Sequence, residues 1–123
     1  MHVIIKNNYD EISKEAAALI ADRIINNPNL VLGLATGSTP LGLYKELIRM
    51  HRDEGLDFSG VRTFNLDEYI GLAPSHTQSY HYFMYDNFFK HVNIPEKSIH
   101  IPDGLAADIE KFCLQYEEEI TRL

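Results

Sequence analysis

Thr36, Gly37, Ser38 and Thr39 form the part of the sequence best suited to binding an anion. They follow an apolar run and precede an amphipathic segment that Pro40 opens, which predicts a strand leading into a helix. The first N–H groups of a helix lack partners, and that end carries about half a positive charge. Gly37 allows close approach to the backbone, and the hydroxyls add donors. One interpretation is a phosphate-binding turn; the other is an ordinary connection capped by Thr39, with Pro40 first in the helix.

A second polar pair, Asp67 and Glu68, comes directly after another predicted strand. If Asp67 is the first residue beyond that strand, its carboxylate points into the same crevice as the 36–39 turn, and Phe64 and Tyr69 shield it partly from water. A carboxylate placed in this way can act as a general base. Glu68 would face another way and bind substrate, orient its neighbours or pair with a cation. Two solvated acids at the start of a loop are the alternative, which an isolated Asp-Glu pair favours.

The other reactive residues give no comparable pattern. The histidines lack the spacing of a metal site, and Ser38 lies in a phosphate-type turn rather than a nucleophile elbow, so we expect neither a metal nor a cofactor. The single cysteine, Cys113, forms no intrachain disulfide; we expect a buried packing residue in a cytoplasmic protein. The net charge of −7 argues against nucleic-acid binding, and no apolar run has the length of a membrane span.

Apolar periodicity places these residues on alternating strands and helices. Strands are expected at Val3–Lys6, Leu30–Ala35 and Val61–Leu66. Helices are expected from Asn8 to about Asn26, from Pro40 to near Gly55, over Ser79–His91 and over Ala107–Leu123, while Ile94–Pro102 is irregular or briefly extended. The apolar face of the first helix carries Ile12, Ala16, Leu19, Ile20 and Ile24.

This alternation predicts an α/β fold with an open, mainly parallel, Rossmann-like sheet flanked by helices. Leu30–Ala35 is apolar nearly throughout, which is typical of a strand covered on both faces. Ligands of such sheets bind beyond the carboxyl ends of the strands. We therefore expect the 36–39 turn and Asp67 at one rim.

Four segments together resemble the glucosamine-6-phosphate deaminase family in order and spacing: ATGSTPLGLYKEL (Ala35–Leu47), FNLDEYIGL (Phe64–Leu72), SYHYFM (Ser79–Met84) and QYEEEI (Gln115–Ile120). The similarity covers essentially the whole chain. The 6-phosphogluconolactonases share the expected fold and a similar Gly-Ser-Thr-Pro loop. Their acidic motif continues as Asp-Glu-Arg, however, whereas Tyr69 follows Glu68 here. Tyr69 and the next residues, Ile70-Gly71-Leu72, favour the deaminases.

The resemblance implies a reaction and gives both polar segments a role in it. Glucosamine 6-phosphate and water would yield fructose 6-phosphate and ammonia, an aldose–ketose isomerisation with deamination in amino-sugar catabolism. In such enzymes the aspartate that matches Asp67 abstracts the proton at C2 of the ring-opened sugar, and an enediol-type intermediate follows. Residues 36–39 match the phosphate-binding loop, which would hold C2 near that base.

The resemblance also implies that residues 1–123 are the N-terminal part of a single sugar-phosphate isomerase/deaminase domain. Family members run to roughly twice this length, and their ring-opening histidine, its assisting acids and a phosphate-binding lysine have no counterpart here. We therefore expect a sheet that is incomplete at its C-terminal side, with an edge open to a missing C-terminal half or to a homo-oligomer. The chain alone would then be a non-catalytic module that binds a phosphorylated amino sugar or pairs with another subunit.

Overall fold

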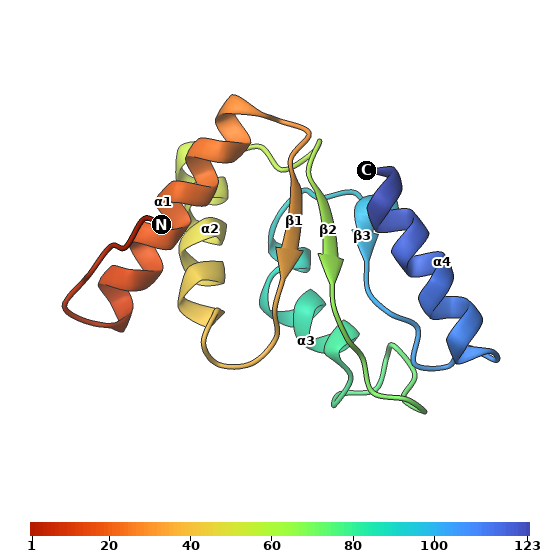
Figure 1. Ribbon diagram of the computed structural model, residues 1–123. Coiled ribbons are helices and arrows are strands. Elements are labelled where there is room, and N and C mark those ends of the chain that lie inside the picture. Colours follow the sequence, from red (N-terminus) through yellow and green to blue (C-terminus); the bar gives the residue numbers. More distant parts are fainter.

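The computed structural model describes all 123 residues and contains helices packed around a three-stranded sheet (Figure 1). The helices are α1 (Tyr9–Asn26), α2 (Leu41–Glu54), α3 (Tyr80–Asn87) and α4 (Ile109–Arg122). The strands are β1 (Val31–Leu34), β2 (Arg62–Asn65) and β3 (Ile99–His100), and short 3₁₀ turns cover Phe89–His91 and Glu96–Ser98. None of the helices has the length and apolar composition needed to cross a membrane.

The sheet is parallel throughout, with the strands in the order β1-β2-β3. Leu34 pairs with Asn65 at the carboxyl ends of β1 and β2, so the chain leaves both strands at the same edge of the sheet. The prediction of an open parallel α/β fold is therefore confirmed. The segment expected to be irregular or briefly extended supplies β3, which pairs with β2.

Helix boundaries follow local capping. The Asn8 side chain accepts a hydrogen bond from the Glu11 N–H (2.9 Å) and starts α1 as expected, while Gly55, with φ of +72°, ends α2. Ser79 caps α3 in the same way through the Tyr82 N–H. The helix predicted over 79–91 is shorter than expected, because the backbone leaves the helical region at Phe88 and continues as a 3₁₀ turn.

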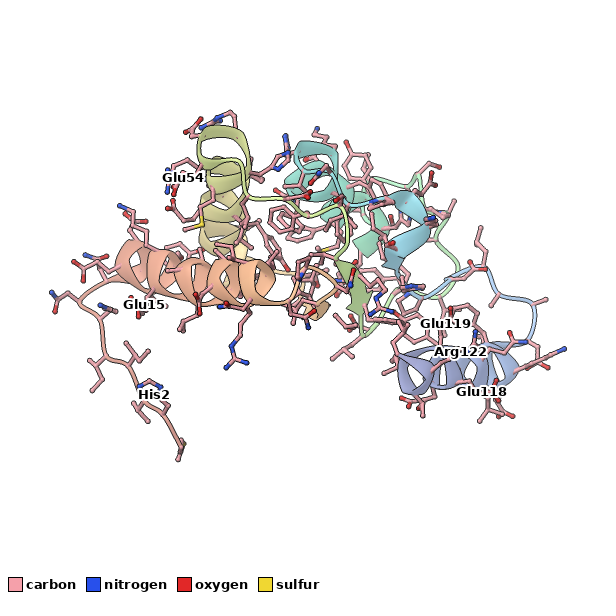
Figure 2. All side chains as sticks on the ribbon, turned by 90° about the horizontal axis from the view of Figure 1, so that it is seen from above. His2, Glu15, Glu54, Glu118, Glu119 and Arg122 are labelled. Atoms are coloured by element: carbon pink, nitrogen blue, oxygen red, sulfur yellow. The ribbon has the colours of Figure 1, made fainter.

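The N-terminal run Val3–Lys6 forms no strand, which corrects the prediction made from its β-branched residues. It is exposed along its length and lies with His2 on an arm that projects from the rest of the chain (Figure 2). A strand needs a neighbour for its backbone hydrogen bonds, and no such neighbour lies beside this arm.

The hydrophobic core lies on one face of the sheet, between the strands and helices α1, α2 and α3. Tyr44 of α2 stacks on Phe88 with ring centroids 5.0 Å apart, and Leu47, Phe58 and Met84 are fully buried around them.

Helix α1 faces this core with small side chains and with Ile24, so the apolar face predicted from the sequence is confirmed only in part. Ile24 is buried and Ile20 packs against the core. Ala17 and Ala21 are buried, whereas Ile12 and Leu19 are about half exposed. The reason is the close approach of α1 to α2: a Cβ placed on Gly42 of α2 would collide with the Ser13 side chain. Small residues on both helices permit that distance.

The opposite face of the sheet is covered only in part. Helix α4 packs there over Phe64, and its Tyr116 hydroxyl donates hydrogen bonds to the carbonyls of Asn65 and His100. Val31 and Gly33 of β1 point to the same face beyond the reach of α4 and are exposed. The prediction that this strand is covered on both faces is therefore wrong for this chain.

Cys113 also differs from expectation. It lies on α4, as predicted, but is exposed rather than buried. Helix α4 contributes no fully buried residue because it covers the sheet from one side only.

Candidate functional site

The 36–39 turn and Asp67 lie at the same rim of the sheet. Figure 1 shows β1 and β2 pointing in one direction, with the connection to α2 and the segment after β2 both leaving from that end. Parallel strands impose this arrangement, since their carboxyl ends share one edge. The expected placement at one rim is therefore found, but the expected shared crevice is not, because the two segments line separate hollows.

The turn has the backbone geometry of an anion-binding loop. Gly37 adopts φ of +93°, in the left-handed region that favours glycine. The backbone N–H groups of Gly37, Ser38 and Thr39 donate no hydrogen bond within the protein, and all three residues are exposed. Thr36 is partly buried beside them. Free N–H groups at the start of a helix provide donors to a bound oxyanion.

The alternative in which Thr39 caps the helix is wrong. Helix α2 begins at Leu41, Pro40 occupies the N-cap position with helical torsion angles, and no side chain caps it. The first N–H groups are satisfied from elsewhere: Leu41 donates to the Ser38 carbonyl, and Gly42 donates to the Tyr9 hydroxyl at 2.8 Å. Thr39 keeps its own hydroxyl and N–H free.

Tyr9 of α1 fixes the turn from outside. Besides accepting from the Gly42 N–H, its hydroxyl lies within donating distance of the carbonyls of Ser38 (3.1 Å) and Thr39 (3.0 Å). These contacts hold the two carbonyls against α1. No sequence signal identifies Tyr9, because only the packing of α1 on α2 brings it to the turn.

Asp67 is exposed at the end of β2, and the predicted shielding by Phe64 is not present. Side chains alternate along a strand, so Phe64 turns to the α4 face and packs against Tyr116, while the chain emerges into solvent at Leu66, which is 82% exposed. Asp67 lines a hollow of about 330 Å³ together with apolar groups that include Ile70 and Phe112.

Glu68 is turned away from Asp67 and toward α3. Its Oε1 accepts hydrogen bonds from the N–H groups of Tyr69 (2.9 Å) and Tyr80 (2.8 Å), and its Oε2 accepts from the His81 N–H (2.9 Å). A carboxylate at the first N–H groups of a helix is favoured by the helix dipole as well as by these hydrogen bonds. Of the roles considered from the sequence, the orientation of neighbouring groups matches this geometry.

Tyr80 of α3 packs against the segment that follows Asp67. Its hydroxyl lies 3.3 Å from the Tyr69 hydroxyl, with the rings 4.7 Å apart. The hydrogen bond with Tyr69 raises the pKa of Tyr80, as do burial and the negative charge of Asp67. Its place directly after the Ser79 cap was the available sequence signal for this position.

His81 follows on the same helix and stacks on Tyr85, with centroids 4.6 Å apart. Burial lowers the pKa of His81, so the imidazole is held more strongly in its neutral form. No group of three or more His, Cys, Asp or Glu side chains gathers in a way that would hold a metal ion.

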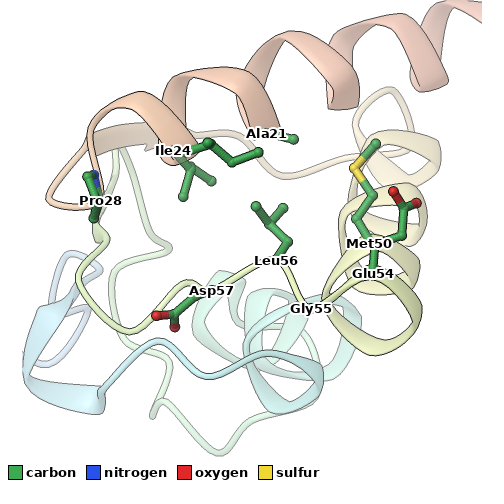
Figure 3. A pocket seen from close by; sticks show the side chains of 9 residues that line it. Ala21, Ile24, Pro28, Met50, Glu54, Gly55, Leu56 and Asp57 are labelled. Carbon is green, nitrogen blue, oxygen red and sulfur yellow. The ribbon is translucent and has the colours of Figure 1, made fainter.

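The predicted site residues do not all share one cavity. Ser38 and Thr39 line a hollow with Tyr9 and Lys45, whereas Asp67 and Glu68 line the hollow beside α4. A third cavity, of about 370 Å³, lies at the opposite end of the sheet between the ends of α1 and α2 (Figure 3). It contains none of the predicted site residues; its labelled lining includes Ile24, Met50, Leu56 and Asp57.

Comparisons with known proteins identify the family of this chain. Residues 6–123 match the family described as glucosamine-6-phosphate isomerases/6-phosphogluconolactonase. Glucosamine-6-phosphate deaminase from a Thermoanaerobacter species is 60% identical over 99% of this chain, which covers 48% of that protein. The protein of the same name from Halothermothrix orenii is 57% identical, with 99% and 51% coverage. The chain thus spans about half the length of the curated relatives it matches.

Solved structures of related proteins superpose on this chain. A monomeric glucosamine-6-phosphate deaminase of the NagB superfamily superposes with a TM-score of 0.96 at 44% identity, over 99% of this chain and 51% of that one. A 6-phosphogluconolactonase from Thermotoga maritima superposes with a TM-score of 0.72 at 22% identity, over 98% and 53%, which shows a shared fold. The chain therefore belongs to the family of glucosamine-6-phosphate isomerases and 6-phosphogluconolactonases.

Proposed function

We propose that the protein to which this chain belongs converts glucosamine 6-phosphate and water to fructose 6-phosphate and ammonia. The observation that carries the proposal is the placement of an exposed carboxylate, Asp67, at the same rim as a turn with free backbone N–H groups. The identity of 60% to a protein named glucosamine-6-phosphate deaminase supports the choice of substrate.

In this proposal the phosphate of the open-chain sugar binds at Thr36, Gly37, Ser38 and Thr39, and Asp67 is the general base. Asp67 removes the proton from C2 and the C1 carbonyl becomes an enol. Return of the proton to C1 leaves a C2 imine, which water hydrolyses to the ketone with release of ammonia. The phosphate is remote from C2, so its binding holds the reacting carbon near the carboxylate throughout the reaction.

We further propose that residues 1–123 are the N-terminal part of one catalytic domain, and that the remaining part supplies the groups for ring opening and a cation for the phosphate. The exposed β1 face and the half-open hollow beside Asp67 support this division. No cofactor is required by the chemistry described. We place the reaction in amino-sugar catabolism in the cytoplasm.

The test is turnover by the intact gene product. Purified protein incubated with glucosamine 6-phosphate should release ammonia and fructose 6-phosphate in equal amounts, while 6-phosphogluconolactone should be hydrolysed no faster than in a blank. Folded protein that leaves glucosamine 6-phosphate unchanged would rule out the proposal. Hydrolysis of the lactone instead would favour the alternative function, a 6-phosphogluconolactonase-like hydrolase. This alternative is considered because the lactonases share the fold.

A second candidate function is a sugar-phosphate-binding module without activity. The separation of the Ser38 and Asp67 hollows favours it for the 123-residue chain taken alone. Titration of that chain with glucosamine 6-phosphate and, separately, with glucosamine shows whether binding depends on the phosphate group. A response to the phosphorylated sugar alone would support a phosphate-binding turn, and equal responses would argue against one.

A further inference from the structure

We infer that Glu68 is a positioning residue for the reaction, because its carboxylate fastens the segment that carries Asp67 to the N-terminus of α3. This inference rests on the proposed function for its catalytic consequence. The fastening itself rests on the structure alone.

The fastening consists of hydrogen bonds that bridge two distant parts of the sequence. Glu68 Oε1 accepts from the N–H of its neighbour Tyr69 and from the N–H of Tyr80, and Oε2 accepts from the N–H of His81. Both carboxylate oxygens are therefore occupied by backbone donors. A side chain engaged in this way is not free to reach a substrate, which separates its role from that of Asp67.

A second contact holds the same segment from the other side. The Gly71 N–H donates to the Gly104 carbonyl at 2.8 Å, and a Cβ on Gly104 would lie 3.4 Å from the Glu68 Cγ and closer still to the Tyr69 carbonyl. The backbone that follows Asp67 thus contacts α3 on one side and the chain after β3 on the other. The side chains of Leu66, Asp67 and Ile70 remain exposed to solvent.

The hydrogen bonds of Glu68 also order the aromatic side chains beside Asp67. Tyr80, whose N–H is held by Glu68, places its hydroxyl 3.3 Å from the hydroxyl of Tyr69. Glu68 therefore fixes the segment that carries Asp67 against α3. A displacement of about 1 Å in a catalytic group can cost on the order of 100-fold in rate, so release of this contact should lower turnover without removing a substrate contact.

The experiment compares Glu68→Ala and Glu68→Gln in the intact gene product. For Glu68→Ala we expect kcat for glucosamine 6-phosphate to fall roughly 100-fold with KM changed by less than about threefold. Glu68→Gln keeps a carbonyl oxygen for Tyr69 and Tyr80 but presents an NH₂ group to the His81 N–H, so we expect an intermediate loss of about tenfold. Amide hydrogen exchange at Tyr80 and His81 should accelerate in the same order.

The matched control is Asp57→Ala. The Asp57 carboxylate also accepts a backbone hydrogen bond, from the Ser59 N–H (2.9 Å), and one from the Asn93 side chain (2.8 Å), but it precedes β2 at the other end of the sheet. It should leave kcat and exchange at Tyr80 unchanged.

Different failures have different meanings. An unchanged kcat in Glu68→Ala, or a loss no larger than that of Asp57→Ala, would overturn the inference. A rise in KM at constant kcat would also overturn it, because Glu68 would then bind substrate directly. If the unmodified protein shows no turnover, the proposed function fails, and hydrogen exchange still decides whether Glu68 fastens the segment.

Discussion

Gly37 holds the 36–39 turn in a conformation that residues with a side chain adopt only at an energetic cost. Its φ is +93°, and a Cβ at this position would meet no other atom within 4 Å, so the constraint comes from the backbone and not from crowding. Gly37→Ala should therefore destabilise the turn by about 1 kcal/mol and weaken the binding of glucosamine 6-phosphate. Calorimetric titration of the intact gene product measures the affinity.

Gly33 of β1 provides the control for this substitution. A Cβ there would also meet nothing within 4 Å, but its φ lies outside the left-handed region. In urea unfolding of the 123-residue chain, Gly33→Ala should be neutral or slightly stabilising, because alanine restricts the unfolded chain. Equal effects of the two substitutions on stability would contradict a special role for the Gly37 backbone.

Asp67 and Glu68 differ in the hydrogen-bond donors around their carboxylates. Glu68 is supported by backbone donors, whereas Asp67 stands exposed at the end of β2 beside apolar groups. A carboxylate needs a substrate proton within hydrogen-bond reach to act as a base. The exposed position leaves Asp67 accessible, and Ile70 and Phe112 line the same hollow.

At the level of helices and strands, the hydroxyls of a buried and a partly buried tyrosine connect α2 and α4 to the ends of β1 and β2. Tyr44 of α2 donates to the Ala35 carbonyl after β1, and Tyr116 of α4 donates to the Asn65 carbonyl at the end of β2. Burial raises the pKa of each from 10.0 to about 12, against the smaller effect of the hydrogen bond.

These shifts predict a loss of stability at alkaline pH. In the unfolded chain a tyrosine ionises near pH 10, whereas in the folded chain it resists ionisation until about pH 12. The stabilisation is complete below pH 10 and is lost as the pH rises from 10 to 12. Urea unfolding of the 123-residue chain across this range should show the decline.

Substitution identifies the groups responsible. Tyr44→Phe and Tyr116→Phe should each lower stability at pH 8 and make the decline above pH 10 shallower. Tyr82→Phe serves as the control, since Tyr82 is 40% exposed. A decline as steep in the double variant as in the unmodified chain would assign the effect to other groups.

The sequence predicted those elements whose signals are local. Asn8, Gly55 and the apolar runs before Thr36 and Asp67 marked helix ends and strands correctly, because capping and strand patterns depend on neighbours in the chain. The inward face of α1 was predicted correctly only at Ile20 and Ile24, since the burial of its small residues depends on how closely α2 approaches at Gly42.

The candidate site was likewise predictable only where its signals are local. The 36–39 turn and the acidic pair Asp67-Glu68 each come directly after a predicted strand, and parallel pairing of these strands brings both to one rim. The contacts of Tyr9 with the turn, and of Glu68 with α3, join residues that are 29 and 12 positions apart. Such long-range hydrogen bonds have no signature in a single sequence.

At the scale of the whole molecule, the chain exposes surface that stable proteins cover. Leu66, Ile70 and Leu114 are at least two-thirds exposed, and β1 and β3 each leave one edge unpaired. Open edges and apolar patches favour association. In sedimentation experiments we expect the 123-residue chain to show an average mass that rises above 14.1 kDa with concentration.

A charge on the exposed face of β1 should reduce this association. Val31→Lys places a cation at the open edge, and Thr77→Lys adds the same charge on an exposed loop as a control. Association should fall in the first variant only. A single species of 14.1 kDa that unfolds cooperatively at all concentrations would contradict the expectation of an incomplete sheet.

The proposed reaction requires Asp67 to act on a sugar whose phosphate is held at the Ser38 turn, and substitution of Asp67 is the decisive experiment. In the intact gene product, Asp67→Asn should lower kcat for glucosamine 6-phosphate by about 10²- to 10⁴-fold, since an amide cannot accept the C2 proton. Binding of the sugar phosphate should remain, and Asp86→Asn on the surface of α3 should leave kcat unchanged. Near-normal turnover by Asp67→Asn would contradict the account.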